Sequence, residues 1–393
     1  MDIKHEAEQL FSYTRALRRD FHQHPELGFN EIRTAGVITR ELTGMGYQVT
    51  TGLGKTGVVG VLKGPADGPT VLLRFDMDAL PIQEENTTDY ASLNPGVMHA
   101  CGHDCHVSVG LTCARMFAAH LSDLKGTIKL VFQPSEETGN GALSMINDGA
   151  LDGPLPDFAL GLHVWNLKPV GWFGITEGPM MAGANRITFK ITGSGGHGAQ
   201  PYLTIDPMIT ATQIVTALQT VVSRNISPLD GAVLSITHME GGSAFNVIPS
   251  TVSAEGTIRA FTPEVRQTIV NRFEEIVKGI ASAMHCSAET AVDPGTHPVI
   301  NDKKVAQKVT ANARELFPDA IIENNYQTMG AEDMSEFLMR IPGCFFFIGS
   351  ANQEKGLAFP HHHPCFDVDE DCLPLGVALL VKTTMDLLSS GLD

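Results

Sequence analysis

Residues 98–106 form the densest group of potential metal-binding side chains in the sequence. This window reads Met-His-Ala-Cys-Gly-His-Asp-Cys-His and contains three histidines, two cysteines and one aspartate. Thiolate and imidazole ligands together suit zinc and its transition-metal neighbours, whereas calcium and magnesium prefer oxygen ligands. The window therefore predicts a transition-metal site, and the alternative is a set of buried polar residues with chance cysteines.

Four further segments carry residue types that would complete such a site. They are Glu136-Glu137 after an apolar run, His163 at the end of another, the triplet His361-His362-His363, and His197 in a glycine-rich loop. Neighbouring side chains diverge on irregular backbone, so one of two adjacent carboxylates can bind metal while the other faces a water molecule. Taken alone, an acidic turn, a core histidine or a flexible loop is the structural alternative for these segments.

The elements that must position these residues alternate along the first part of the chain. Strands are predicted at Val58–Leu62, Val71–Phe75, Thr127–Phe132 and Phe158–His163, with helical patterns between them. This alternation favours an α/β domain with a mostly parallel central sheet, closed by a last helix over Leu375–Leu388. Enzymes of this class keep their sites on loops at the carboxyl ends of the strands.

The N-terminal segment predicts a surface helix near residues 6–20, a loop from His22 that contains Pro25 and Gly28, and a second helix over Thr34–Met45. The segment Gly52–Gly57 matches the G-x-G-x-x-G pattern, but a dinucleotide fingerprint must follow a strand and open a helix. Here the pattern precedes a β-branched run, which predicts a hairpin turn.

Residues 185–297 follow a different order. The predicted elements are strand Arg186–Thr192, helix Pro207–Val222, strands Ala232–Glu240 and Thr251–Ala260, helix Pro263–Met284 and strand Cys286–Val292. This β-α-β-β-α-β order is that of the ferredoxin-like fold. We expect an inserted domain at 185–297 and a discontinuous catalytic domain at 1–184 and 298–393, since a chain of 393 residues suits two domains.

Composition limits the partners and the compartment. The net charge is −17, from 44 acidic and 27 basic residues, so nucleic acid and anionic membranes are excluded as main partners. No run approaches the ~18 uncharged apolar residues of a membrane span, and the N-terminus has no apolar signal segment. Seven cysteines without regular disulfide spacing lead us to expect a reducing cytoplasm.

The combined motifs resemble the M20 metallopeptidase family in its amidohydrolase branch, over essentially the whole chain. That branch includes hippurate hydrolase, N-acyl-amino-acid amidohydrolases, auxin-conjugate hydrolases and N-acetyl-diaminopimelate deacetylase. The matching motifs are Arg74–Glu84, Met98–His106, Gln133–Glu137, Gly161–His163, Gly196-His197, Gly242–Pro249, Gly330–Asp333 and His362–Pro364, with the loop His22–Phe29 as an N-terminal signature.

The resemblance implies two divalent metal ions per subunit, Zn²⁺ or one of Mn²⁺, Co²⁺ and Ni²⁺. Cys101 is then the bridging ligand, which other branches supply as aspartate, and Glu136 is the general base and acid. The implied remaining ligands are His103, Glu137, His163 and His362. Three histidines precede Pro364 where the branch usually has one; register to the proline selects His362, with His361 the alternative.

Residues around these ligands have expected supporting roles. Asp78 and Asp104 are expected to orient ligand histidines, as metal-bound imidazoles require. His106 either does the same or is a core histidine. His99 and Cys105 are expected to pack in the core.

The resemblance also implies a shared site in a homodimer, or a dimer of dimers, formed by an inserted domain that serves as dimerisation or lid domain. His197 and Asn246 match the histidine and asparagine that donate hydrogen bonds to the oxyanion of the partner subunit's site. Arg259 matches the position of an arginine that binds the α-carboxylate of the substrate, and a surface salt bridge is the alternative.

These expectations together indicate a metal-dependent amidohydrolase that cleaves the amide bond of small N-acyl-amino acids, hippurate-like or N-acetylated, by a metal-activated water with a glutamate base. The alternatives are a dipeptidase or aminoacylase of another M20 branch, N-acetyl-diaminopimelate deacetylase, and a non-enzymatic metal-binding scaffold. The scaffold predicts loss of the base or a ligand, and none is missing. Acyl group, amino-acid side chain and stereochemistry are not fixed by the sequence.

Overall fold

The structure, a computed structural model, describes residues 2–392 and divides into two compact units. The first unit contains the chain through Met180, the segment Ile300–Gln327 and the chain from Asp333 onward. The second contains Met181–Val299 and Thr328–Glu332. The short segment joins the second unit because the N–H of Ala182 lies within hydrogen-bond distance of the carbonyls of Thr328 (3.2 Å) and Gly330 (3.1 Å).

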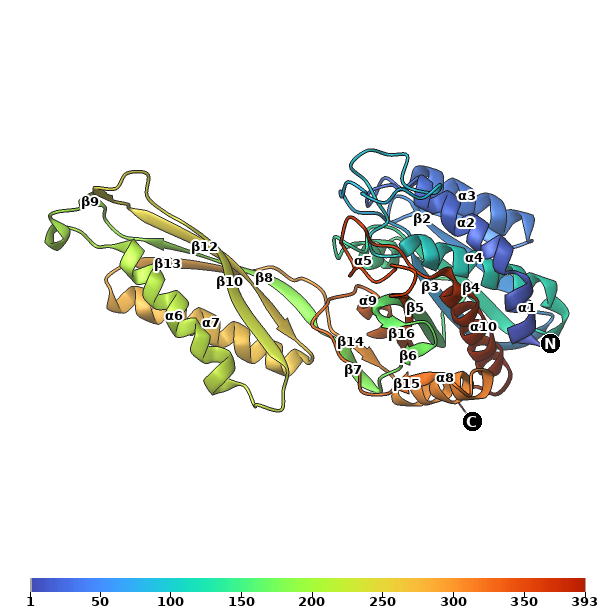
Figure 1. Ribbon diagram of the computed structural model, residues 1–393. Coiled ribbons are helices and arrows are strands. Elements are labelled where there is room, and N and C mark those ends of the chain that lie inside the picture. The colour runs from blue at the N-terminus through green and yellow to red at the C-terminus, as the bar shows by residue number, and fades with distance from the viewer. Residues whose placement is uncertain (1, 393) are drawn as a thin grey trace. The chain divides into compact units, whose positions relative to one another are not determined.

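The first unit is built on an eight-stranded sheet of order β1-β2-β4-β3-β5-β16-β6-β15 (Figure 1). Its strands are β1 (Gln48–Leu53), β2 (Gly57–Lys63), β3 (Ala66–Asp76), β4 (Lys125–Gln133), β5 (Phe158–Pro169), β6 (Trp172–Gly174), β15 (Ile321–Glu323) and β16 (Gly343–Ala351). The four central strands β4, β3, β5 and β16 run parallel, which confirms the predicted α/β fold with a mostly parallel sheet. Two further strands, β7 (Gly178–Met181) and β14 (Val299–Asn301), pair separately.

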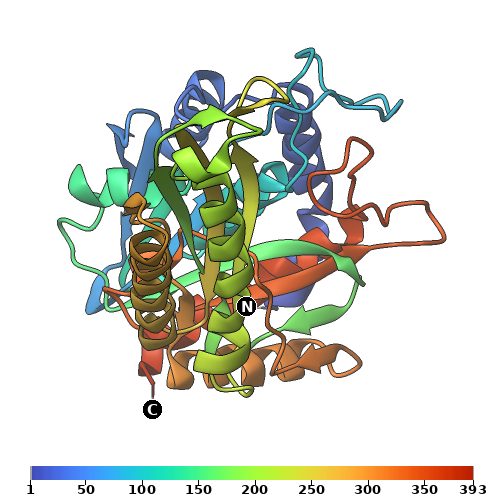
Figure 2. The ribbon, with the colours of Figure 1, turned by 90° about the vertical axis from the view of Figure 1, so that its left-hand side faces the viewer.

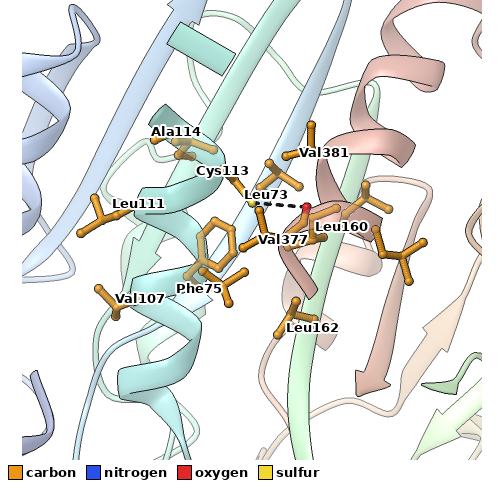
Figure 3. Close-up of a cluster of buried hydrophobic side chains, with 14 of the residues drawn as sticks. Leu73, Phe75, Val107, Leu111, Cys113, Ala114, Leu160, Leu162, Val377 and Val381 are labelled. Carbon is orange, nitrogen blue, oxygen red and sulfur yellow. Dashed lines mark hydrogen bonds between the residues drawn. The ribbon is translucent and has the colours of Figure 1, made fainter. Parts of the chain in front are cut away.

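Helices cover this sheet and bury its apolar side chains. They are α1 (Ile3–Gln9), α2 (Phe11–Gln23), α3 (Ile32–Gly44), α4 (His103–Ala119), α5 (Gly141–Asn147), α8 (Lys303–Leu316), α9 (Ser335–Leu338) and α10 (Leu373–Ser390), with short 3₁₀ turns η1 (Leu121–Asp123) and η3 (Glu370–Cys372). Figure 3 shows the core where α4 and α10 meet β3 and β5, with the Cys113 thiol facing the carbonyl of Val377. By length and composition Glu370–Ser390 passes as a membrane span, but 67% of its apolar window is buried, as in a core helix.

The N-terminal helix differs from the prediction of one surface helix near residues 6–20. The chain forms two helices, α1 and α2, and α2 continues to Gln23 with His22 still helical. The side chains of Arg18 and His22 are fully buried. Helical periodicity assigns arginines to the solvent-facing side of a helix. Arg18 is buried instead, because buried carboxylates from distant segments lie beside its guanidinium.

The predicted hairpin at Gly52–Gly57 is confirmed, since β1 and β2 pair antiparallel with Leu53 opposite Gly57. The predicted strands of the first unit fall within β2, β3, β4 and β5. Strand β16, in the middle of the sheet, has no counterpart in the sequence analysis.

The second unit has the expected ferredoxin-like order of elements. These are β8 (Gly183–Thr192), α6 (Pro207–Asn225), β10 (Ala232–Glu240), β12 (Thr251–Ala260), α7 (Pro263–Ala283) and β13 (Ser287–Val292), and the antiparallel sheet has the order β10-β12-β8-β13. Figure 2 shows α6 and α7 side by side along one face of this sheet. Beyond the end of β8 lie a ribbon of β9 (Gly196–His197) and β11 (Val247–Ile248) and the 3₁₀ turn η2 (Pro201–Leu203).

Candidate metal centre

The predicted ligands of the first unit come from chain segments at the carboxyl ends of its parallel strands. Strand β3 ends at Asp76, two residues before Asp78, and β4 ends at Gln133, ahead of Glu136 and Glu137. His163 lies in β5 itself. Because these strands are adjacent and parallel, their carboxyl ends bring the following side chains to one edge of the sheet.

Gly102 sets the geometry of the segment between Cys101 and His103. It precedes α4 with φ +92°, a left-handed conformation that L-residues rarely adopt. A Cβ at this position would also overlap the side chain of Val164. The glycine therefore lets Cys101 stand before the helix while His103 occupies its first turn.

His103 presents a free ring nitrogen to the centre. Its Nδ1–H faces the carbonyl oxygen of Asp78 (2.9 Å) and the carboxylate oxygen Oδ1 (3.2 Å), so Nε2 is the ring nitrogen left for a metal ion. That Nε2 is buried and has no hydrogen-bond partner among residues 2–392. Asp78 also accepts the backbone N–H of Glu137 through Oδ2 (3.1 Å), so one carboxylate orients two predicted ligands.

The surroundings of His103 favour a cation. Burial lowers the pKa of His103, but the carboxylates of Asp76, Asp78 and Glu137 raise it more, to about 10. A metal ion at Nε2 would satisfy the same excess of negative charge and the same unpaired ring nitrogen.

His163 is held in the matching tautomer. Its Nδ1–H donates to the carbonyl of Val164 (2.6 Å), and its Nε2 lies 3.5 Å from the sulfur of Cys101. Burial and the neighbouring His106 and His361 hold its pKa well below the usual range. His163 is therefore neutral, which is the form that binds metal.

The structure brings His362, and not His361, to Cys101 and Glu137. His362 has φ +66°, and its Nε2 lies 3.3 Å from Oε1 of Glu137. The ring of His361 has other partners: its Nε2 accepts the backbone N–H of Asn166 (3.2 Å), and its centroid lies 5.0 Å from that of Trp165 and 5.3 Å from that of His163. The geometry thus favours the residue that register to the proline selects.

Cys101 belongs to two groups of donor atoms that are close enough to share a metal ion. One group is Cys101, His103 and His163, the other is Cys101, Glu137 and His362, and the atoms of each group lie within 4.8 Å of one another. Burial and the nearby Glu137 and Glu136 raise the pKa of the Cys101 thiol well above its usual range. A metal ion would be needed to form the thiolate, and this donor set of sulfur, imidazole and carboxylate fits zinc and its neighbours.

Glu136 lies beside both groups but outside them. It forms a further close group with His103 and Glu137. Ser135, just before it, has φ +53°, and its buried N–H donates to Glu31 Oε1 (2.9 Å). The irregular backbone at Ser135 is thus fixed by a residue of the N-terminal segment.

The other polar residues of the Met98–His106 window have partners within the protein, except His99, whose two buried ring nitrogens have no hydrogen-bond partner among the described residues. His106 donates from Nδ1 to Asp76 (2.5 Å) and accepts the N–H of Val164 at Nε2 (3.0 Å), so neither ring nitrogen is available to a metal. Asp104 contacts Arg18 and His22 instead of a predicted ligand histidine. Cys105 and His99 are buried, as packing residues would be.

Three predicted site residues lie in the second unit. His197 is exposed in β9, opposite Val247 of β11, and the carbonyl of Asn246 accepts the N–H of Gly198 (2.8 Å). His197 Nδ1 accepts the N–H of Ala199 (3.0 Å), which leaves Nε2–H as a free donor. His197 and Asn246 therefore sit together on one ribbon with a polar group available.

Arg259 lies at the other end of the same four-stranded sheet. It pairs with Ala184 near the start of β8, whereas the ribbon that carries His197 follows Thr192 at the end of β8. These ends are about 25 Å apart at ~3.3 Å per residue. Arg259 donates to the carbonyl of Ile258 (3.0 Å) and has no carboxylate partner in the described part of the chain, so no salt bridge accounts for it.

The sequence analysis missed the buried residues that surround the ligands. Arg74 of β3 donates to Asp76 (2.6 Å), the residue that holds His106, and also to Gln133 (2.7 Å) and Asp333 (2.9 Å). All four of these positions lie inside motifs quoted above, but no residue spacing marks which of them touch.

Known proteins resemble this chain in sequence and in fold. The peptidase family M20/M25/M40 matches residues 72–386. The chain is 39% identical to the N-acetyl-L-cysteine deacetylase of Bacillus subtilis, over 95% of this chain and 88% of that protein. It is also 39% identical to the IAA-amino acid hydrolase ILR1-like 4 of Arabidopsis thaliana, over 94% of this chain and 84% of that protein.

A solved structure of a metal-binding member of the family has the same fold. The Bacillus subtilis YXEP protein, a dinuclear metal binding peptidase from the M20 family, superposes with a TM-score of 0.86 and 33% identity. The match covers 98% of this chain and 99% of that chain. The chain therefore belongs to peptidase family M20/M25/M40 and is a hydrolase that acts on amide bonds.

Proposed function

We propose that the protein is a two-metal amidohydrolase that cleaves N-acyl-amino acids to a carboxylic acid and a free amino acid. The observation that carries this proposal is Cys101, which two groups of donor atoms share, with Glu136 beside both. Two similar proteins are named for N-acetyl-L-cysteine and for IAA-amino acids. Both acyl classes, short and aromatic, are therefore candidate substrates.

The ligands are Cys101, His103, Glu137, His163 and His362. Two divalent ions held by these residues, Zn²⁺ or Mn²⁺, Co²⁺ or Ni²⁺, would polarise the amide carbonyl and lower the pKa of water. Asp78 keeps the Nε2 lone pair of His103 directed at the centre and fixes the backbone at Glu137. This support keeps the donor atoms in place without movement at the moment of reaction.

Glu136 moves the protons. It accepts a proton from the attacking water and returns it to the leaving amide nitrogen, which is general base and then general acid catalysis. The adjacent Glu137 is held by Asp78, so the two neighbouring carboxylates have separate tasks.

His197 and Asn246 stabilise the oxyanion of the tetrahedral intermediate. The free Nε2–H of His197 is the required donor, because its Nδ1 is already occupied by the N–H of Ala199. Arg259 binds the α-carboxylate of the substrate, since its guanidinium has no acidic partner within the described residues and the net charge of −17 opposes an anion elsewhere.

The active form is a homodimer with shared sites. Arg259 lies at one end of the four-stranded sheet, and the ribbon with His197 follows the other end, which lies about 25 Å away along β8, so one copy cannot offer both to a small substrate. Two copies can, if Arg259 comes from one and the ribbon with His197 from the other. The cytoplasm is the proposed location, supported by seven free cysteines.

A substrate panel with a base variant tests the reaction. N-acetyl-, N-benzoyl- and N-indoleacetyl-amino acids, N-acetyl-diaminopimelate and dipeptides are assayed for amine release with Zn²⁺, Mn²⁺ or Co²⁺. Turnover of N-acyl-amino acids is expected, and Glu136→Gln is expected to keep its metal and lose about 10²–10⁴-fold in kcat. Turnover of dipeptides alone would contradict the proposed substrate class, and near-normal kcat in the variant would contradict the role of Glu136.

A complementation experiment tests the shared site. His197→Ala and Glu136→Gln variants are each expected to be inactive, and a refolded one-to-one mixture should recover about a quarter of the wild-type activity. Mixed dimers contain one site with both residues intact. A mixture as inactive as its components would show that His197 serves its own subunit.

A further inference from the structure

Arg18 of α2 is a fully buried cation that joins separate segments of the first unit. Its Nε lies 2.8 Å from Asp104, its Nη2 lies 2.6 Å from Asp367, and its Nη1 lies 3.4 Å from Glu370. Asp104 and Asp367 are themselves buried. Each of the three nitrogens of this buried guanidinium therefore contacts a different carboxylate.

One of the two shortest contacts lies next to a predicted metal ligand, and the other lies on the segment that follows one. Asp104 directly follows His103 in the first turn of α4. Asp367 lies five residues after His362 and fixes its own backbone, since it accepts the N–H of Val368 through Oδ1 (2.8 Å). One guanidinium therefore connects the helix that carries His103 with the turn that carries His362.

The turn needs such support because its own conformation is unfavourable. His362 has φ +66°, a left-handed conformation that is strained for a residue that is not glycine. Its side chain is 52% exposed, so packing gives the ring little restraint. The backbone N–H of His362 bonds the carbonyl of Ala100 (2.8 Å). Further along, the carbonyls of Pro364 and Phe366 accept from Glu85 N–H (3.0 Å) and Asn86 Nδ2 (3.0 Å), and Asp367 then bonds Arg18, the buried charged anchor of the segment.

We propose that Arg18 is a positioning residue that holds the His362 turn against the His103 helix and thereby completes the second metal site. The proposal rests on the metal centre of the proposed function and adds a residue outside the segment 72–386 that matches the family. Arginine is required over lysine, because only the planar fork reaches Asp104 and Asp367 at once.

The proposal makes the two donor groups respond differently. Cys101, His103 and His163 are held by Gly102, Asp78 and Val164, and those contacts do not include Arg18. The group of Cys101, Glu137 and His362 depends on the turn. A purely structural role would instead lower the stability of the whole unit and leave both metals equally bound in the folded fraction.

Metal stoichiometry in Arg18→Lys tests this difference without any activity assay. Folded protein is equilibrated with Zn²⁺ at a series of chelator-buffered concentrations, and bound zinc is measured by mass spectrometry. The variant is expected to bind its first ion as the wild type does and its second about 10- to 100-fold more weakly. With Co²⁺, the absorption band of the Cys101 thiolate should persist in both proteins.

Arg19→Gln is the matched control. Arg19 is adjacent, is partly exposed and bonds only Glu370 among these acids (2.9 and 2.7 Å). The Arg19→Gln variant is expected to bind both metal ions with wild-type affinity. Equal affinity for the second ion in Arg18→Lys and wild type would overturn the proposal.

If Arg18→Lys does not fold, the same zinc titration is carried out on Tyr90→Phe. Its hydroxyl donates to Asp367 Oδ2 (2.7 Å), so the variant loosens the same anchor without removing a buried charge. A several-fold weaker second ion supports the proposal and unchanged affinity overturns it. A wild-type chain that binds no second ion would contradict the proposed function itself, which is a separate result.

Discussion

Glu31 accepts the backbone N–H of Ser135 through a buried carboxylate oxygen, at an N···O distance of 2.9 Å. The same carboxylate accepts the hydroxyl of Thr56 through its other oxygen (2.5 Å). Ser135 has φ +53° and precedes the proposed base Glu136. Glu31, from the N-terminal segment, thus holds the backbone next to the proposed base Glu136.

Replacing Glu31 with alanine is expected to leave the N–H of Ser135 buried without an acceptor. The cost is about 1–3 kcal/mol of unfolding free energy, and kcat should fall by about 10- to 100-fold because the base loses its position. Urea unfolding and steady-state kinetics measure the two effects. Thr56→Val, which removes only the hydroxyl contact, serves as the control and should keep kcat near the wild-type value.

The histidine triplet offers a second prediction. His362→Ala is expected to lose one of two bound metal ions and at least about 100-fold in kcat, because it removes a ligand. His361→Asn is expected to retain both ions, because His361 bonds Asn166 and packs on Trp165. Metal analysis of the two purified variants decides, and the opposite pattern would make His361 the ligand.

His22 predicts how stability depends on pH. Burial and Arg18 lower the pKa of this histidine, but Asp104 and Glu84 raise it more, and the net value is about 9. The unfolded value is about 6.5, so the charged form stabilises the fold by about 3 kcal/mol. That stabilisation is fully present below pH 6.5 and is lost as the pH rises through 9.

The check compares wild type with His22→Gln in metal-free buffer between pH 6 and 9.5. The difference in unfolding free energy is expected to be largest near pH 6 and to shrink towards pH 9. A difference that is constant with pH would show that His22 is not charged in the folded protein.

Gly102→Ala is expected to destabilise the protein and weaken metal binding. The new methyl group meets the side chain of Val164, and the left-handed φ adds about 1 kcal/mol of strain. Thermal unfolding with and without Zn²⁺ measures the effect. Gly36→Ala is a suitable control, because a Cβ there meets nothing within 4 Å and alanine favours the helix.

Much of the fold follows from local sequence signals. Apolar runs of four to eight residues between helical patterns locate β2, β3, β4 and β5, and the order of elements defines the second unit. Strand β16 has an equally apolar sequence, but it pairs with β5 across about 180 residues of chain, and no local pattern encodes that pairing.

The candidate site divides in the same way. Residue types pick out the Met98–His106 window and the pair Glu136-Glu137 as able to bind metal, whereas the choice of Cys101, His103 and Glu137 within them follows from the resemblance to the family. Spacing does not show that Asp104 faces Arg18. A charged residue such as arginine is assigned to the surface from sequence, and only its partners in the folded chain show that it is buried. The tautomers of His103 and His197 likewise depend on contacts that only the folded chain provides.

The interruption of the first unit by the second fixes the order in which the site is made during synthesis. Cys101, His103 and His163 leave the ribosome before the second unit, which has its own core and can fold while the rest is still being made. Strand β16 and the His362 turn follow it. The residues of the first donor group are therefore synthesised early, and the second group is complete only when His362 has been added near the end of translation. A chain that is released before His362 lacks a ligand of the second metal site.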